Sequence, residues 1–90
     1  MNFSWDERKA ASNRKKHGVS FDEATTVFAD PLALAIEDLL DPGRTLLLGM
    51  SIRLRILLVV HAELDEDNIR IISARRATSH ERRRYEEEGH

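Results

Sequence analysis

The sequence predicts an α+β fold in which an antiparallel four-stranded sheet packs against two N-terminal helices and one C-terminal helix. Helix-start signals occur before residue 21 and after residue 77, and strand-like segments fill residues 32–75 between them. Short polar turns join the later segments, as they do between antiparallel neighbours. Because helices and strands are segregated along the chain, we expect a two-layer arrangement, and 90 residues suffice for one domain, residues 1–90.

The first expected helix covers residues 6–17 and ends at Gly18, a residue type that favours helix C-termini. Residues 2–5 before it are either a short strand or an ordered lead-in. Ala10 and Ala11 are the only apolar side chains of this helix. A helix with so little apolar surface cannot lie deep in a core, so we expect much of it to face water or a charged partner.

The other two expected helices each begin at a capping box, in which a hydroxyl and a carboxyl three residues apart satisfy free backbone N–H groups. Ser20 and Glu23 open the second helix, and Thr78 and Glu81 open a helix that runs to about residue 87. The second helix has an apolar stripe at helical spacing: Phe21, Ala24, Val27 and Phe28. Pro31 ends it, because the residue before a proline disfavours helical geometry.

Between these helices, four segments rich in aliphatic residues are predicted strands: 32–38, 45–51, 54–63 and 69–75. In the third, alternation places Arg55, Leu57, Val59, His61 and Glu63 on one face and Leu54, Ile56, Leu58, Val60 and Ala62 on the other. We expect the second, wholly apolar face to lie under the helices, and Leu57 and Val59 to remain as surface that a partner covers. The last strand alternates Ile69, Ile71, Ser73 and Arg75 with Arg70, Ile72, Ala74 and Arg76.

The net charge of −2 hides an uneven distribution along the chain. Residues 1–20 carry +3, residues 21–42 carry −6, residues 43–62 carry +3 and residues 63–90 carry −2. Such alternation places a basic patch and an acidic patch on one small surface. Arginine outnumbers lysine by 11 to 3, and the planar guanidinium suits bidentate contact with phosphate.

Several classes of protein are not expected. The chain has no cysteine, its histidines form no close ligand pair, and the acids of residues 65–67 suit a solvated turn, so we expect no metal and no cofactor. The charged residues 6–9 do not suit a signal peptide, and the longest apolar run, residues 56–60, is too short to span a bilayer. We therefore expect a cytoplasmic protein without membrane contact.

Two motifs near the ends of the chain resemble those of the BrnT family. The first is WDERKAASNRKKHGVSFDEATTVFADP, which resembles the family opening W-D-x-x-K-x-x-x-N-x-x-K-H-G-V-x-F-x-E-A. The second is RIISARRATSHERRRYEE, which resembles the family ending I-R-I-I-S-A-R-x-A-T-x-x-E-R-x-x-Y. Between them, the segment DPLALAIEDLLDPGRTLLLGMS is similar to the middle strands of the family, so the resemblance covers almost the whole chain.

This resemblance implies a toxin of a type II toxin–antitoxin system, with a RelE-like fold, that cleaves RNA and thereby inhibits translation. It implies a BrnA-type antitoxin with a ribbon-helix-helix part, so the toxin would meet DNA only through the antitoxin. Because ribbon-helix-helix proteins are obligate dimers, we expect a 2:2 complex. The alternative is a non-catalytic protein-binding module that acts as a co-repressor, whose basic patches would meet acidic protein instead of RNA.

Metal-free RNA cleavage needs a group that takes the proton of the 2′-hydroxyl, a group that protonates the leaving 5′-oxygen, and cations that stabilise charge on the phosphate. The catalytic candidates are His61, Arg75, Lys9, Tyr85 and Glu63. The candidates for substrate binding are Arg55, Arg53, Arg76, Lys16, His17 and Asn13. We expect the cationic side chains of the last strands and the first helix to gather in one hollow that fits a phosphodiester.

Several of these candidates have structural alternatives. The resemblance implies Arg75, since RelE-like nucleases hold the scissile phosphate with an arginine late in the last strand, and Arg76 is then peripheral. His61 and Glu63 either supply acid–base chemistry or end the edge of the sheet. Tyr85 either contributes to catalysis or packs the last helix onto the sheet with its hydroxyl at the rim.

The first helix carries a further set of candidates. Lys9, Asn13 and Lys16 recur at helical spacing and share one exposed face, which follows an RNA backbone, meets an acidic antitoxin segment or is a solvated helix face without a ligand. His17 stands at the helix end, where its role is structural, and lies close to the expected site. Trp5 either stacks on a base or anchors the core.

Overall fold

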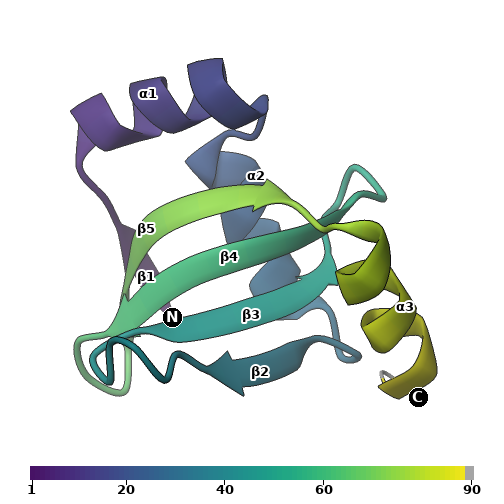
Figure 1. Ribbon diagram of the computed structural model, residues 1–90. Coiled ribbons are helices and arrows are strands. Elements are labelled where there is room, and N and C mark those ends of the chain that lie inside the picture. Colours follow the sequence, from purple (N-terminus) through teal and green to yellow (C-terminus); the bar gives the residue numbers. More distant parts are fainter. Residues whose placement is uncertain (89–90) are drawn as a thin grey trace.

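The computed structural model describes residues 1–88, which form a five-stranded sheet and three helices (Figure 1). The strands are β1 (Asn2–Ser4), β2 (Leu34–Glu37), β3 (Thr45–Met50), β4 (Ile56–Glu63) and β5 (Asn68–Arg76). The helices are α1 (Glu7–His17), α2 (Phe21–Thr26), which continues as a 3-10 turn (Val27–Ala29), and α3 (Ser79–Glu88). Residues 89–90 of the predicted domain lie outside the described part. None of the helices in that part combines the length and the apolar character needed to cross a membrane.

The strands lie in the order β1-β5-β4-β3-β2. The pairs β2–β3, β3–β4 and β4–β5 are antiparallel, as the short turns predicted. The prediction of four strands is wrong, because β1 forms a fifth that pairs in parallel with β5, from Asn2 opposite Asn68 to Ser4 opposite Arg70. The structure thus decides for the first of the two alternatives given for residues 2–5. A strand of three residues shows too little alternation for the sequence to decide between them, and its partner lies near the other end of the chain.

The capping signals of the second and third helices are confirmed. The Ser20 hydroxyl accepts a hydrogen bond from the Glu23 N–H at 3.0 Å. At α3 the exchange is reciprocal: the Glu81 N–H donates to the Thr78 hydroxyl at 3.2 Å, and the Thr78 N–H donates to the Glu81 carboxylate at 2.8 Å. Gly18 ends α1 in the left-handed region with φ of 70°, a conformation that glycine adopts without strain.

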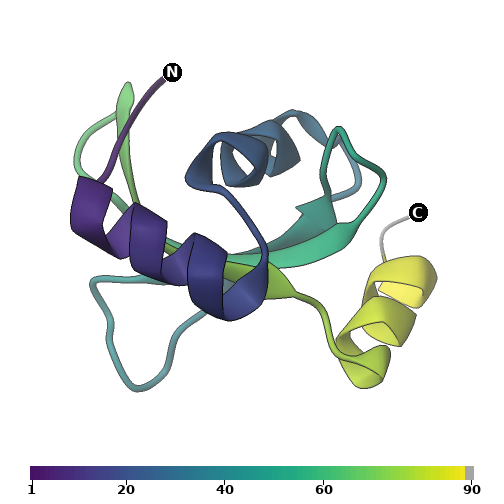
Figure 2. The same ribbon diagram turned by 90° about the horizontal axis from the view of Figure 1, so that it is seen from above.

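The helix α2 and its 3-10 turn cover one face of the sheet, which we call the covered face, while α1 lies along the β5 edge (Figures 1 and 2). The buried core of the covered face consists of Val19, Phe21, Ala24, Val27, Leu57, Val59, Ile69, Ile71 and Ala74. Leu57 and Val59 are 0% exposed, so the prediction that the opposite row of β4 lies under the helices is wrong. Both rows are apolar in the middle of the strand, so alternation identifies the residues that share a face but not the face that α2 covers.

We call the opposite face the open face, because α3 covers only one end of it. Tyr85 of α3 packs there against Leu48 and Leu58. Half-buried aliphatic side chains continue this face: Ile36, Leu46 and Val60. The two views place α2 and α3 on opposite sides of the sheet, so the prediction of two layers is wrong as well (Figures 1 and 2). The surface left for a partner lies on this face and does not include Leu57 and Val59, contrary to prediction.

A β-bulge changes the alternation of the last strand. The β4–β5 register shifts by one residue between Val60 and His61, which leaves Ile72 without a partner residue on β4. Ala74 consequently joins Ile71 in the core of the covered face. The predicted alternation, which placed these two residues on opposite faces, is wrong because it assumed a strand without a bulge.

Asn13 attaches α1 to the free edge of β5. Its side-chain amide donates to the carbonyls of Ala74 at 2.8 Å and Val19 at 3.0 Å, and it accepts from the Ala74 N–H at 3.1 Å. Because β1 pairs only with the first three residues of β5, Asn13 supplies backbone partners beyond the end of β1. The predicted exposed row Lys9–Asn13–Lys16 is therefore wrong at its middle member, which is 7% exposed.

Candidate functional site

The charges of the chain separate toward the two ends of the sheet. The β2–β3 and β4–β5 connections lie at one end (Figure 1), and acidic side chains gather there: Asp38, Asp41, Glu63, Asp65, Glu66 and Asp67. The end of α1, the loop 51–55, the end of β5 and the start of α3 lie at the other end. We call this the basic end, with the cationic residues Lys15, Lys16, His17, Arg53, Arg55, Arg75, Arg76 and Arg82. The alternation of charge along the sequence thus produces a surface suited to a polyanion at one end only.

The last turn of α1 lies beside the arginines that end β5. The two elements run in the same direction (Figures 1 and 2), and the bonds between Asn13 and Ala74 set their register. Four residues of helix rise about 6 Å, which is about two residues of strand. Lys16 and His17 are therefore placed alongside Arg75–Arg76.

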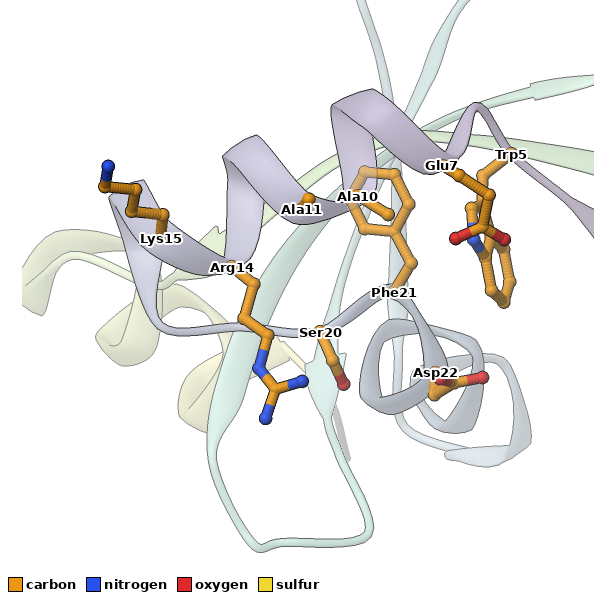
Figure 3. Close-up of a pocket in the computed structure, with 9 residues that line it drawn as sticks. All are labelled: Trp5, Glu7, Ala10, Ala11, Arg14, Lys15, Ser20, Phe21 and Asp22. Atoms are coloured by element: carbon orange, nitrogen blue, oxygen red, sulfur yellow. The ribbon is translucent and has the colours of Figure 1, made fainter.

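A cavity of 720 Å³ lies between α1 and α2 (Figure 3). Its lining consists of Trp5, Glu7, Ala10, Ala11, Arg14, Lys15, Ser20, Phe21 and Asp22. Trp5 meets Phe21 edge to face with ring centroids 5.9 Å apart, and it packs against the covered core. Trp5 thus has the anchoring position that was one of its two predicted roles.

Lys9 and Lys16 project from the side of α1 that faces away from this cavity. The cavity takes its α1 residues from one side of the helix, represented by Ala10 and Arg14, and Lys9 and Lys16 lie on the opposite side by helical spacing. Both lysines are exposed. They flank Asn13 at the edge of the sheet, so they remain available to a ligand that approaches β5 from the open face.

Arg55 is held by the N-terminal turn of α2. Its Nε donates to the Glu23 carboxylate at 2.9 Å, a second nitrogen contacts the same carboxylate, and it also donates to the Gly18 carbonyl at 3.2 Å. Glu23 is 6% exposed and also accepts from the Ser51 hydroxyl at 2.7 Å. The hydrogen bonds from Arg55 lower the pKa of Glu23 despite its burial, and Glu23 raises the pKa of Arg55. Arg55 therefore ties the loop 51–55 to α2, while Arg53 stays largely exposed 3.8 Å from the same carboxylate.

Arg75 is held by α3 and lies on the open face, opposite Leu58. Its two terminal nitrogens donate to the two oxygens of Glu81 at 2.8 and 3.0 Å. These bonds lower the pKa of Glu81 to about 2, so Glu81 is a carboxylate at neutral pH. The Arg75 side chain nevertheless remains 39% exposed, which leaves part of the guanidinium for a second anion.

His61 is closed off at the other end of β4. It is 2% exposed, its ring packs edge to face on Phe28 at 4.8 Å, and its Nδ1 has no hydrogen-bond partner. Burial lowers the pKa of His61, and Glu63, 4.0 Å away, opposes this effect only in part. His61 lies six residues from Arg55, about 20 Å along the strand.

Tyr85 packs α3 onto the sheet, the structural alternative for this residue. It is 7% exposed, and its hydroxyl donates to Asp30 at 2.7 Å. Burial, together with the Asp30 carboxylate, raises the pKa of Tyr85 to about 12. Burial opposes ionisation of Asp30, but hydrogen bonds from Met50 N–H, from Tyr85 and from Leu32 N–H hold its pKa below the ordinary value. The tyrosine hydroxyl therefore serves to attach α3.

The single hollow expected for Lys9, Arg55, His61 and Arg75 does not exist. Arg55 is bound on the covered face, Arg75 lies on the open face, and His61 is buried toward the acidic end. The predicted residues that the fold does bring to the basic end are Lys16, His17, Arg53, Arg55, Arg75 and Arg76. The reason is the bulge and the placement of α2, which together send neighbouring cationic side chains to different faces.

Lys15 and Arg82 are the basic-end residues that the sequence analysis did not name as candidates. The motif R-R-R at residues 82–84 suggests pairs with acids four residues later, yet in the described chain only Arg84 forms one, with Glu88 at 2.7 Å. Arg82 and Arg76 form no salt bridge within residues 1–88, unlike Arg55 and Arg75. In the same residues, no three His, Asp or Glu side chains are grouped so that they hold a metal ion.

Two comparisons with known proteins, one with family models and one with solved structures, found similar proteins. Residues 5–81 match the family model described as ribonuclease toxin, BrnT, of type II toxin–antitoxin system. The fold is similar to a crystal structure of the Brucella abortus ribonuclease toxin BrnT, with a TM-score of 0.72 and 25% sequence identity, over 88% of this chain and 99% of that one. No curated protein sequence matches the chain.

Proposed function

The chain belongs to the BrnT family of ribonuclease toxins of type II toxin–antitoxin systems, and from this premise we propose that it is an endoribonuclease that cleaves RNA without a metal ion and so inhibits translation. The observation that carries the proposal is the basic end. Cationic groups from α1, β5 and α3 gather there although the whole chain has a net charge of −2. Such a concentration attracts a polyanion and holds its phosphates.

The side chains of the basic end suit the charge-stabilising part of the reaction. Arg75 is placed to stabilise the charge that builds up on the phosphate oxygens. Lys9 and Lys16 follow the RNA backbone along the edge of β5. His17 is half-buried at the end of α1 and is our candidate for proton transfer, because a neutral imidazole has one nitrogen that donates and one that accepts a hydrogen bond.

Three of the residues predicted to be catalytic are not placed to take part in the reaction at the basic end. His61 is sealed under Phe28, and Glu63 lies at the acidic end. The Tyr85 hydroxyl is bound to Asp30 and its pKa is raised to about 12. We therefore assign His61 and Tyr85 to packing and Glu63 to the solvated surface.

Cleavage of RNA by the isolated protein tests the proposal. Antitoxin-free protein, shown to be folded by circular dichroism, is incubated with a single-stranded RNA in excess EDTA, and the products are analysed by mass spectrometry. We expect fragments that end in a 2′,3′-cyclic phosphate, since the 2′-hydroxyl is the nucleophile when no metal activates water. Intact RNA after incubation with folded protein would contradict the proposal.

A type II toxin implies a protein antitoxin as partner. We propose that this partner is a BrnA-type ribbon-helix-helix protein, that the complex is 2:2, and that the toxin contacts DNA only through it. The half-buried aliphatic side chains of the open face and the unpaired edge of β2 support the proposal, since they offer an apolar surface and a strand edge. Light scattering on the co-expressed pair tests the stoichiometry, and a 1:1 complex would contradict it.

The second candidate function is a non-catalytic co-repressor that only binds the antitoxin. The bidentate pairing of Arg75 with Glu81 favours it, because a paired arginine has fewer donors for RNA. A growth assay separates the two functions. Induction of this chain without antitoxin stops growth if it is a nuclease and is tolerated if it is a co-repressor.

A further inference from the structure

A cleft of 140 Å³ opens between the basic end of the sheet and α3. Its lining comes from two stretches of the chain, residues 50–56 and residues 76–86: Met50, Leu54, Arg55, Ile56, Arg76, Ala77, Arg82 and Glu86. Three of these eight residues are arginines and one is an acid. Such a lining favours an anion, provided that the arginines are not already neutralised.

The three arginines of the cleft differ in their partners. Arg55 is bound by Glu23, which offsets its charge. Arg76 and Arg82 form no salt bridge within residues 1–88, and both side chains are exposed. The charge available in the cleft is therefore that of Arg76 and Arg82, reduced by Glu86.

The walls of the cleft are fixed by hydrogen bonds. The Ala77 N–H donates to the Ile56 carbonyl at 2.9 Å, which holds the end of β5 against β4. On the other side, the Leu54 N–H donates to the Ser51 carbonyl at 2.9 Å, and Leu54 adopts a φ of 63°, rare for a residue with a side chain. A strained backbone conformation costs free energy and persists only where surrounding contacts hold it. Such conformations are common at binding sites.

We propose that this cleft binds one phosphodiester of single-stranded RNA, and that Arg82 together with Arg76 holds it. Guanidinium groups without a protein partner bind phosphate oxygens in bidentate fashion. Since Arg75 precedes Arg76 on β5, the cleft lies next to the phosphate position assigned to Arg75 and serves a neighbouring nucleotide. The inference deepens the proposed nuclease function and rests on it for the identity of the ligand.

Binding of an uncleavable RNA tests the inference without any dependence on catalysis. A 2′-O-methyl oligoribonucleotide of about ten nucleotides is titrated at several salt concentrations into wild-type protein and Arg82→Gln, with Arg83→Gln as the matched control. Arg83 follows Arg82 on α3 but does not line the cleft. We expect Arg82→Gln to weaken binding and to reduce the slope of log Kd against log salt by about 0.7, the value for one phosphate contact on a single strand.

The other variants give expectations of known sign. Arg83→Gln keeps the wild-type slope, and Glu86→Gln tightens binding, because it removes the acid that opposes the anion. Equal slopes for wild type and Arg82→Gln, or no measurable binding by the folded wild-type protein, would overturn the inference.

Cleavage kinetics separate this inference from the nuclease proposal. If the protein cleaves RNA, Arg82→Gln should raise KM several-fold with little change in kcat, as expected for a lost binding contact. If Arg82→Gln cleaves RNA with an unchanged KM and binds the oligonucleotide as the wild type does, the cleft proposal is wrong and the nuclease proposal stands. If the wild-type protein leaves all RNA intact but binds the oligonucleotide, and Arg82→Gln loses that binding, the nuclease proposal is wrong and the cleft proposal is supported.

Discussion

On the covered face of the sheet, Glu23 encloses Arg55, whose side chain is 20% exposed, whereas on the open face Arg75 is 39% exposed although Glu81 binds it. Both arginines have a carboxylate partner, but the side chain of Arg75 is more exposed to a ligand than that of Arg55. The difference comes from the helices: α2 presses Glu23 against the end of β4, while α3 meets the open face at one end only.

The same contrast applies to the two histidines of the candidate site. His61 lies on the covered face, under Phe28, and is 2% exposed. His17 is half-buried at the end of α1, beside the last residues of β5. Residue type alone therefore does not indicate the site, and the packing of the helices decides which cationic and titratable groups remain available to RNA.

The largest effect is expected from removal of the cation on the open face. Arg75→Ala should lower the rate of RNA cleavage by ~10²–10³, the usual cost of one lost donor to the transition state. Initial rates on a fluorescent RNA measure it. Glu81→Gln is the control, because it weakens the tether to α3 but keeps the guanidinium, and its loss should be smaller. Equal losses in the two variants would mean that Arg75 acts only by attaching α3.

On the covered face, removal of the acid should change stability. Glu23→Ala leaves Arg55 without its buried partner and should lower the free energy of unfolding by about 3 kcal/mol. Urea denaturation followed by circular dichroism measures it. Glu66→Ala, in an exposed turn, is the control and should change stability by less than about 0.5 kcal/mol. A similar small change for Glu23→Ala would show that the pair does not hold the fold.

A smaller, pH-dependent effect is expected from His61. Because its pKa in the folded protein lies below the ordinary value of 6.5, the unfolded chain takes up this proton first as the pH falls. The free energy of unfolding should therefore decrease as the pH falls from about 7 to 5, by at most about 1.4 kcal/mol per pH unit. Glu81 contributes in the same direction only below its ordinary pKa of 4.5.

The variant His61→Phe should flatten this pH dependence and keep the rate of RNA cleavage. Denaturation at several pH values and the cleavage assay at neutral pH measure the two effects. A loss of cleavage in a stably folded His61→Phe protein would show that His61 takes part in the reaction. It would contradict the conclusion that burial on the covered face excludes His61 from the site.

The local elements of the fold were predictable from the sequence. Capping boxes at Ser20 and Thr78 depend on residues three positions apart. The structure confirms the hydroxyl cap at both, but the reciprocal bond only at Thr78, because the Glu23 carboxylate binds Arg55 and Ser51 instead. The strands β2 to β5 and their antiparallel turns were likewise indicated by short-range pattern. Failures began where distant segments meet: β1 pairs with β5, and the bulge near His61 reverses the alternation that had separated Ala74 from Ile71.

The candidate site was predictable only as a set of residue types. The sequence identifies Arg55, Arg75 and Arg76 as cationic residues near strand ends. It does not reveal that Glu23, far away in the chain, binds Arg55. Spacing alone does not single out Arg82, because acids four residues later suggest pairing for every arginine of the R-R-R motif; the signal that could have found it is the E-R of the family ending, which matches Glu81 and Arg82. Partners and exposure are tertiary properties, and they decide which arginines can bind RNA.

The amide spectrum of the ¹⁵N-labelled protein, titrated with uncleavable 2′-O-methyl RNA, tests the location of the site most directly. We expect the largest shifts at the basic end, at Lys16, His17, Arg75, Arg76 and Arg82. The amide resonances of the residues around His61 and in the acidic turn 64–67 should not shift. Shifts concentrated at that acidic end, with none at the end of β5, would contradict the placement of the site.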